Sequence, residues 1–425
     1  MKKFYLLGVG GVSMSALAIL MKEKGCEVSG CDETSGRGTQ VLQEHGIEVD
    51  FELSKAKLKD ADVVICSSAI KGDHPWKIAS RKMKKKILTR GQLLGEISDE
   101  YEKVIAVAGS HGKTTTTAMI FQILSVAGLN PTLHLGGFRA EDKLNFCLGG
   151  KEYFVTEACE YCNNFLNLHP YISVVTNIEK EHMDFFKTFS NQLKSFEQFK
   201  SQSRFVIDNM GKVETRKVHH DENGNLCFSL FDDGKKVMDL KLNICEDVNT
   251  QNCIYAYLVA KKLGISNQVI KAGLEEFRGV GLRFERMKCP YFDTVICDYA
   301  HHPTEIKKSI ETAKKVTKGK KLMIVFQPHT FSRTKTLLHE FLQVFEKEEN
   351  VVIFKTYSAR EKETEGISGK GLGEILNERG AKAKYFDNFE SLQKYLLSFD
   401  GKKTALLFVG AGDLPSVLHK NNFVE

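Results

Sequence analysis

The stretch VIAVAGSHGKTTTTAMIFQIL, residues 104–124, joins an apolar strand-like run to a helix-like run through a glycine loop. Gly112, Lys113 and Thr114 stand at the start of the expected helix, which is the context that a phosphate-binding loop requires. Loop N–H groups can surround a polyphosphate, the lysine can neutralise its oxygens, and the threonine hydroxyl can bind Mg²⁺. The first glycine departs from the usual spacing, because Val107 stands where glycine is expected and Gly109 follows two residues later. The stretch predicts a nucleotide polyphosphate site.

Composition indicates a soluble, multidomain protein. At ~100–200 residues per domain, a chain of 425 residues is expected to form about three domains. The longest apolar runs are far shorter than the roughly 20 residues of a membrane helix, so no membrane partner is expected. Sixty basic residues against 54 acidic ones give a net charge of +6, and the lysines are dispersed apart from RKMKKK at 81–86. We therefore expect no nucleic-acid partner.

The eleven cysteines predict free thiols in a reducing compartment. Their number is odd, they are scattered, and Cys66, Cys147 and Cys297 fall in apolar runs. A cytoplasmic location fits best. Cys159 and Cys162 form one CxxC pair without a second pair at zinc-site spacing, so we expect no metal or redox role for them.

Strand-like and helix-like segments alternate in three series, which predicts the α/β class with parallel sheets. The expected domains are 1–100, 101–278 and 279–425. The central one, which contains the glycine loop, is expected to be of the P-loop ATPase type. The polar section 208–248 contains DENGN and DDGKK turns and is expected to form an antiparallel hairpin region.

Two further segments follow apolar strands of the central series and carry candidate metal ligands. Glu157 ends EYFVTEA, and His182 lies in TNIEKEHMD, directly after YISVV. Ligands of open α/β sheets gather at the carboxyl ends of strands, where the glycine loop also lies. Because Mg²⁺ binds phosphate with one or two protein carboxylates, both residues are candidates for a magnesium site.

The first series begins with a second glycine turn. Gly8, Gly10 and Gly11 follow a strand, Ser13 replaces the last glycine of the dinucleotide pattern, and Asp32 ends the next strand. A diphosphate at the helix N-terminus is expected, but the turn does not separate NAD from UDP. Two nucleotide sites in one chain favour group transfer over hydride transfer, and a dehydrogenase stays open as an alternative.

Several motifs resemble the Mur ligase family in sequence and in order, over residues 4–413. They are GVGGVSMSALA, VVICSSAI, AVAGSHGKTTTT, TEACEYCNNFLNLHP, VVTNIEKEHMD, DYAHHPTEI, FQPHTFSRTK, TYSAREK and GAGD. They are most similar to those of members that join L-alanine to UDP-N-acetylmuramate in peptidoglycan synthesis. The resemblance implies three domains: a Rossmann-like domain for the UDP-sugar, a central ATP domain and a Rossmann-like C-terminal domain that closes over them. It implies ATP and Mg²⁺ as cofactors. It also implies that ATP first phosphorylates the muramate carboxylate, and that the amine then attacks the acyl phosphate. A monomer or weak homodimer is expected.

The resemblance assigns site residues motif by motif. Catalysis falls to Lys113, Glu157 and His182, and the metal ligands are Thr114, Glu157 and His182. The implied ATP contacts are Gly109, Ser110, His111, Gly112, Lys113, Thr114, Thr115, Asn249, Asn252, Arg283 and Asp298. The implied substrate contacts are Gly8, Gly10, Gly11, Ser13, Met14, Asp32, Ser67, Ser68, Ala69, Tyr299, His301, His329 and Arg333.

Some positions depart from the family pattern. Glu246 and Val248 stand before Asn249, at positions where the family usually has a glycine and a histidine. In the motif TEACEYCNNFLNLHP, Glu160 is the one further carboxylate after Glu157. A lysine that some relatives carbamylate has no assignable counterpart. Two alternatives stay open: a relative that attaches a recycled murein peptide to the same sugar nucleotide, and a catalytically idle nucleotide-binding homologue.

Overall fold

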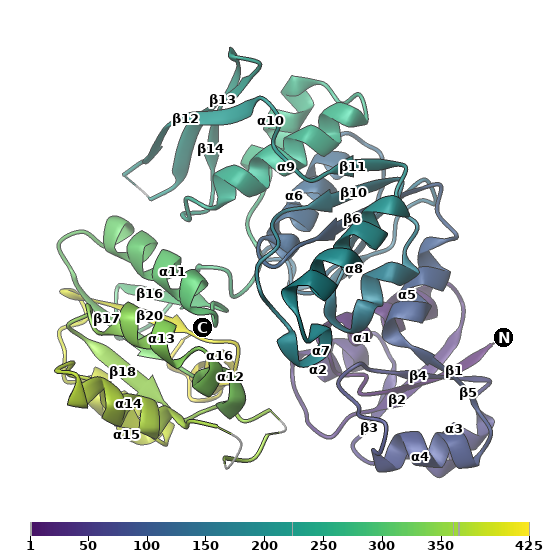
Figure 1. The fold of residues 1–425 in the computed structure, drawn as a ribbon, viewed down its shortest axis with the longest axis horizontal. Coiled ribbons are helices and arrows are strands. Elements are labelled where there is room, and N and C mark those ends of the chain that lie inside the picture. The colour runs from purple at the N-terminus through teal and green to yellow at the C-terminus, as the bar shows by residue number, and fades with distance from the viewer. Residues whose placement is uncertain (1, 223, 360, 364–365, 425) are drawn as a thin grey trace. The chain divides into compact units, whose positions relative to one another are not determined.

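The computed structural model describes residues 2–222, 224–359, 361–363 and 366–424 (Figure 1). Contacts divide the described chain into two compact units. The first comprises residues 1–219, 227–243 and 248–280, and the second comprises 220–226, 244–247 and 281–425. Arg360 of the TYSAREK motif lies outside the described residues.

The N-terminal part of the first unit is a parallel sheet in the order β3-β2-β1-β4-β5. This is the Rossmann strand order without its sixth strand. Its strands are β1 (Lys3–Leu7), β2 (Glu27–Cys31), β3 (Glu48–Asp50), β4 (Val63–Cys66) and β5 (Lys86–Thr89). Its helices are α1 (Val12–Glu23), α2 (Arg37–Glu44), α3 (Lys55–Asp60), α4 (Pro75–Lys82) and α5 (Arg90–Ser98).

The following part of the first unit is a second sheet in the order β11-β10-β6-β9-β7-β8, parallel except for the β7–β8 pair. Its strands are β6 (Lys103–Ala108), β7 (Thr132–His134), β8 (Phe146–Cys147), β9 (Tyr153–Glu157), β10 (Ile172–Val175) and β11 (Phe205–Ile207). Its helices are α6 (Lys113–Val126), η1 (Tyr161–Asn167), α7 (Met183–Phe186), α8 (Phe189–Ser201), α9 (Asn249–Lys262) and α10 (Asn267–Glu276). Val104 to Ala108 of β6 are buried, as expected for a central strand covered on both faces.

The polar section forms a small sheet in the order β12-β13-β14, beside α9 and α10 (Figure 1). Its strands are β12 (Val213–His220), β13 (Leu226–Asp232) and β14 (Lys235–Leu242). Asp233 and Gly234 join β13 to β14, both with positive φ, as a two-residue hairpin turn requires. The hairpin expected in this section is confirmed.

The second unit contains a sheet in the order β15-β16-β20-β17-β18-β19, parallel except for the β15–β16 pair. Its strands are β15 (Glu285–Met287), β16 (Thr294–Asp298), β17 (Lys321–Phe326), β18 (Val351–Phe354), β19 (Lys384–Phe386) and β20 (Thr404–Val409). Its helices are α11 (Pro303–Val316), α12 (Phe331–Thr336), α13 (Leu338–Phe345), α14 (Gly369–Glu378), α15 (Phe389–Leu396) and α16 (Leu414–Lys420). Apolar clusters that include Phe326 and Phe408 pack against this sheet.

One buried cluster joins the first two sheets. It runs from Phe4 and Leu17 in the N-terminal part to Phe154 and Phe199 in the following part, so the two parts share a continuous core. The α/β class and the parallel sheets predicted from the alternation are confirmed.

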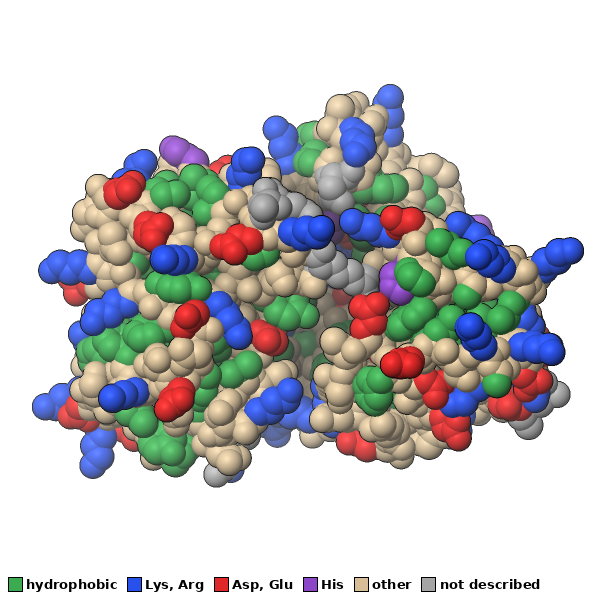
Figure 2. Space-filling model, turned by 90° about the horizontal axis from the view of Figure 1, so that it is seen from below, with side chains coloured by type: hydrophobic (Ala, Val, Ile, Leu, Met, Phe, Trp, Pro, Cys, Tyr) green, Lys and Arg blue, Asp and Glu red, His purple; other side chains and the backbone are tan. Residues whose placement is uncertain are grey.

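Thiols and surface charges can be compared with their sequence-based predictions. All eleven cysteines, which lie in the described ranges, are thiols outside any disulfide; Cys66 and Cys297 are buried, whereas Cys147 is only partly buried. Figure 2 shows Lys and Arg side chains interspersed with Asp and Glu on the face it presents, in keeping with the dispersed lysines of the sequence. Within the described ranges, no helix has the length and apolar character needed to cross a bilayer.

Candidate active site

The glycine loop lies between the end of β6 and the start of α6. Gly109 and Gly112 have φ of +133° and +81°, a region that glycine enters far more readily than other residues. Val107 is still inside β6, paired with Glu157 on β9 and Val174 on β10. The loop therefore begins at Gly109, which explains why the first glycine of the usual pattern is displaced.

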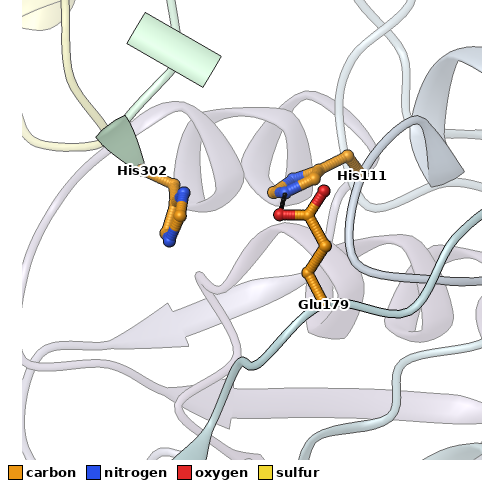
Figure 3. Close-up of side chains that lie close together, drawn as sticks. All are labelled: His111, Glu179 and His302. Atoms are coloured by element: carbon orange, nitrogen blue, oxygen red, sulfur yellow. Dashed lines mark hydrogen bonds and ion pairs between the residues drawn. The ribbon is translucent and has the colours of Figure 1, made fainter. Parts of the chain in front are cut away.

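The segment after β10 holds the loop in place. Thr176 Oγ1 donates to the carbonyl of His111 at 2.6 Å, and the His111 N–H donates to Asn177 Oδ1 at 2.9 Å. Ser110 Oγ accepts from the Glu179 N–H at 2.9 Å. The His111 ring points toward the Glu179 carboxylate, with 3.3 Å between Nε2 and Oε2 (Figure 3). These bonds fix the loop before any ligand binds, which is the preorganisation that phosphate binding needs.

Asn249 and Asn252, assigned to the ATP side, lie in the first turn of α9 behind the loop. Both are buried; Asn252 Nδ2 donates to Asn249 Oδ1 at 2.8 Å, and Thr116 Oγ1 donates to Asn252 Oδ1 at 3.3 Å. Their side chains thus connect α9 to α6. Val248 is the N-cap of α9 and provides no side-chain cap.

Lys113 is folded back against its own loop. Its ammonium group donates to the carbonyls of Gly109 and Ser110, the latter at 3.2 Å, and pairs with Glu160 Oε1 at 3.2 Å. Glu160 is completely buried. Burial alone would lower the pKa of Lys113, but the charges of Glu160 and Glu181 outweigh it and raise the pKa. The lysine is therefore a permanent cation at the place where phosphate oxygens would lie.

Thr114 and Glu157 lie on either side of a glycine pair. The Gly136 N–H donates to Glu157 Oε1 at 2.6 Å, and a Cβ on Gly137 would come within 3.0 Å of the Thr114 methyl group. Since β6 and β9 are neighbours, the glycine loop and Glu157 share one edge of the sheet. The sequence predicted this placement at the carboxyl ends of the strands.

A second group of possible metal ligands consists of Glu160, Glu181 and His182. Their ligand atoms lie within 4.8 Å of one another, with His182 Nε2 3.8 Å from Glu160 and 3.9 Å from Glu181. The Oε2 atoms of Glu160 and Glu181 are buried and have no hydrogen-bond partner among the side chains that the structure describes, so two carboxylate oxygens are available to a cation. Tyr161 packs its ring against His182 at 4.8 Å. Sequence reasoning missed Glu181, although its position beside His182 in EKEH was a usable signal.

The first glycine turn lies at the carboxyl edge of the N-terminal sheet. Asp32 Oδ2 accepts the Gly10 N–H at 2.9 Å, so this carboxylate holds the turn itself. Gly8 has φ of +74°, and a Cβ there would approach the Ser67 side chain. Ser67, Ser68 and Ala69 follow β4 at the same edge.

Two of the residues assigned to this turn have partners in the interior. Met14 is 1% exposed and packs in the core, so its side chain does not line the turn. Ser13 Oγ lies 2.9 Å from His134 Nε2 and accepts from Arg90 Nη1 at 2.8 Å. Neither His134 nor Arg90 was singled out from the sequence.

The second unit has its own cluster of assigned residues. The Arg283 guanidinium lies over the Tyr299 ring at 5.2 Å. The His301 and His329 rings are 6.2 Å apart, and Arg333 Nη1 is 3.1 Å from His329 Nδ1. The structure thus brings these third-domain residues together at the ends of β16 and β17.

Protonation within this cluster is set mainly by burial. Burial lowers the pKa of His301 to about 3 and that of His329 to about 4, and Arg333 adds to both shifts, so both imidazoles are neutral at neutral pH. Asp298 is buried and accepts from Ser309 Oγ, and burial raises its pKa. Tyr357, which the sequence analysis did not assign, stacks on His329 at 5.6 Å. The cluster offers neutral imidazoles, two arginines and aromatic rings to a small ligand.

Three family models match successive parts of the chain. Family models match residues 3–102 (Mur ligase family, catalytic domain), 107–254 (Mur ligase middle domain) and 282–412 (Mur ligase, glutamate ligase domain). The chain belongs to the Mur ligase family, whose three-domain architecture it shares.

Relatives and solved structures match over nearly the full length. The UDP-N-acetylmuramate--L-alanine ligase of Caldicellulosiruptor saccharolyticus is 36% identical, over 97% of both chains. The crystal structure of the UDP-N-acetylmuramate-alanine ligase of Thermotoga maritima has a TM-score of 0.87 at 26% identity, over 99% of this chain and 98% of that one. A murein peptide ligase of Psychrobacter arcticus shares the fold, with a TM-score of 0.71 at 20% identity over 99% and 98% of the two chains.

Proposed function

We propose that this protein is an ATP-dependent ligase that joins L-alanine to UDP-N-acetylmuramate in peptidoglycan synthesis. The observation that supports this proposal most is the preorganised glycine loop, which has Lys113 and buried carboxylates beside it at one edge of the sheet. Relatives that match nearly the full length of the chain are named as ligases with this activity. The better match to an alanine ligase structure than to a murein peptide ligase supports a single amino acid as the acceptor.

The proposed reaction has two steps. The γ-phosphoryl group of ATP passes to the muramate carboxylate, which gives an acyl phosphate and ADP. The amine of L-alanine then attacks the acyl carbon, and the amide forms as phosphate leaves and the amine loses a proton. Lys113 and the loop N–H groups would hold the transferred phosphoryl group and neutralise its charge, which is the main demand of phosphoryl transfer.

The residues at the loop fit a magnesium ion. Mg²⁺ prefers oxygen ligands, and the chain offers Thr114 and Glu157 at one place and Glu160, Glu181 and His182 at another. When bound, such an ion neutralises phosphate charge. The buried carboxylate oxygens without partners are the observation that supports this assignment.

We retain three further assignments as parts of the proposal. The turn at Gly8–Ser13 would bind the UDP-sugar, and the His301–His329–Arg333 cluster would receive the amino acid. The functional division would be 1–100, 101–278 and 279–425. The protein would act in the cytoplasm as a monomer or weak homodimer, without nucleic acid or membrane, and the free cysteines support the reducing compartment.

Phosphate release tests the proposal. Purified protein receives ATP, Mg²⁺, UDP-N-acetylmuramate and one member of a panel of amino acids and a murein tripeptide. We expect release only when all components are present, with L-alanine giving the highest kcat/KM. Preference for the tripeptide would establish the peptide-recycling alternative, and absence of release with every acceptor would establish an idle homologue.

A further inference from the structure

Arg90 lies where the two parts of the first unit meet. It is the first residue of α5, directly after β5, at the carboxyl edge of the N-terminal sheet. The next turns of α5 pack closely on η1, since a Cβ on Gly91 or Gly95 would clash with Asn164 or Asn167. The segment η1 follows Glu157 and Glu160, and the charge of Arg90 acts on Cys159, which precedes Glu160 directly.

A directed chain of hydrogen bonds starts at Arg90. Its Nη1 donates to Ser13 Oγ at 2.8 Å, and Ser13 Oγ lies 2.9 Å from His134 Nε2. His134 Nδ1 lies 2.9 Å from Thr156 Oγ1, whose hydroxyl donates to the Glu157 carbonyl at 3.1 Å. Because the Thr156 hydroxyl already donates to the Glu157 carbonyl, its oxygen accepts a hydrogen bond from His134 Nδ1–H. His134 Nε2 therefore accepts the Ser13 proton, which leaves Ser13 Oγ to accept from Arg90.

This chain is buried and holds one protonation state. His134 is 1% exposed and Thr156 is fully buried, and they are opposite each other on β7 and β9. Burial, with the charge of Arg90 as a second cause, lowers the pKa of His134 to about 3, so the ring stays neutral. A neutral ring with a fixed tautomer keeps the Ser13 hydroxyl oriented as an acceptor for Arg90.

Most N–H donors of the Arg90 guanidinium group have no hydrogen-bond partner among the described residues. A guanidinium has five N–H donors, and Arg90 uses one of them, on Ser13. Across the residues that the structure describes, no carboxylate lies within 4.0 Å of it. A partly buried cation without a counter-charge is costly unless an anion completes the site. Its charge also reaches Cys159, as does that of Lys113.

We propose that Arg90 binds an anionic group of the sugar nucleotide, either the diphosphate or the lactyl carboxylate. Arginine suits both, because its planar fork matches phosphate and carboxylate oxygens. Ser13 lies in the first turn of α1, where a diphosphate would meet the helix N-terminus, and Arg90 extends that site toward Glu157. The inference rests on the proposed function for the identity of the ligand.

Calorimetric titrations without ATP test this assignment, with UDP, UDP-N-acetylglucosamine and UDP-N-acetylmuramate as ligands. Arg90→Gln should weaken binding of UDP-N-acetylmuramate about tenfold or more, whereas Arg90→Lys should recover part of the loss. If all three ligands lose affinity equally, the group bound is the diphosphate. If only the muramate nucleotide does, it is the carboxylate. Lys86→Gln, which removes an exposed charge at the other end of β5, is the matched control.

A steady-state experiment separates binding from a structural role. Arg90→Gln should raise KM for UDP-N-acetylmuramate and leave KM for ATP within about twofold of wild type, with an unchanged thermal midpoint. Unchanged affinity of Arg90→Gln for all three ligands would refute the inference. Equal rises in both KM values with a lowered midpoint would also refute it, because the arginine would then be a structural group. Absence of phosphate release by the wild type would refute the proposed function instead.

Discussion

Lys113 Nζ lies 3.2 Å from Oε1 of Glu160, a completely buried carboxylate. The second oxygen of Glu160 has no partner, and His182 Nε2 lies 3.8 Å from the first. One glutamate therefore links the loop lysine to the candidate metal ligands. Its negative charge balances the Lys113 ammonium group beside the glycine loop.

We expect Lys113→Ala to abolish phosphate release with the fold preserved. The substitution removes the cation that would neutralise the transferred phosphoryl group. The measurement is kcat with saturating substrates, together with a circular-dichroism melting curve. Lys200→Ala is the control, because Lys200 pairs only with Glu197 and Asp208 among its described ion pairs and should retain wild-type turnover. Turnover by Lys113→Ala at the wild-type rate would remove the lysine from the mechanism.

His182→Gln should increase the Mg²⁺ concentration required for half-maximal activity. The imidazole is one of three ligand groups within 4.8 Å, and its loss leaves two carboxylates to hold the ion. A titration of Mg²⁺ at fixed ATP measures the change. His169→Gln is the control, because His169 is exposed and pairs with Asp99. This variant should require the same Mg²⁺ concentration for half-maximal activity as wild type. Identical curves for the two variants would contradict a metal site at His182.

Gly112→Ala should weaken ATP binding as well as stability. An alanine at φ of +81° costs about 1–2 kcal/mol, and its Cβ would overlap Asn252 Oδ1. Gly128→Ala is matched to it, since Gly128 has φ of +72° at the other end of α6 with no atom within 4 Å of the added carbon. We expect a larger loss of thermal stability in Gly112→Ala, because of that overlap, and a raised KM for ATP only in this variant. Equal KM values would mean that the loop tolerates a side chain.

His134 should make the protein less stable in mild acid. Its pKa is about 3 in the fold, below the roughly 6.5 of an unfolded chain, so the unfolded state binds the extra proton between these values. The free energy of unfolding therefore rises with pH through this window and is flat above it. Between pH 8 and pH 5 this residue should cost about 2 kcal/mol.

Urea unfolding of wild type and His134→Gln at both pH values measures that contribution. The glutamine variant should lose about 2 kcal/mol less than wild type between pH 8 and pH 5. Other titrating groups are common to both proteins and cancel in the comparison. Equal pH dependence would show that His134 is protonated in the fold or accessible to water.

Much of the phosphate site could be predicted from local sequence. Gly109, Gly112 and Lys113 lie in one strand–loop–helix unit, whose geometry depends on residues adjacent in the chain. Glu157 and His182 could be predicted because parallel strands end at the same edge of a sheet. The hairpin at 233–234 could be predicted from its turn residues.

Residues that act through long-range contacts could not be found in this way. Glu181 stands beside His182 in the sequence, but only the fold places its carboxylate, with one buried oxygen, within 4.8 Å of the ligand atoms of Glu160 and His182. Asn252 could be assigned to the ATP side from its motif. The contact of its amide with Thr116, behind the loop, depends on how α9 packs on α6.

The sequence by itself determined the α/β class, the position of the glycine loop and the metal-ligand candidates at strand ends, because these follow from periodicity and from neighbours along the chain. Only the tertiary structure decided that Lys113 pairs with Glu160, and that Arg90, Ser13, His134 and Thr156 form one chain. Those contacts join residues 22 to 121 positions apart. Burial and hydrogen-bond partners at such separations are properties of the packed core, and no local pattern contains them.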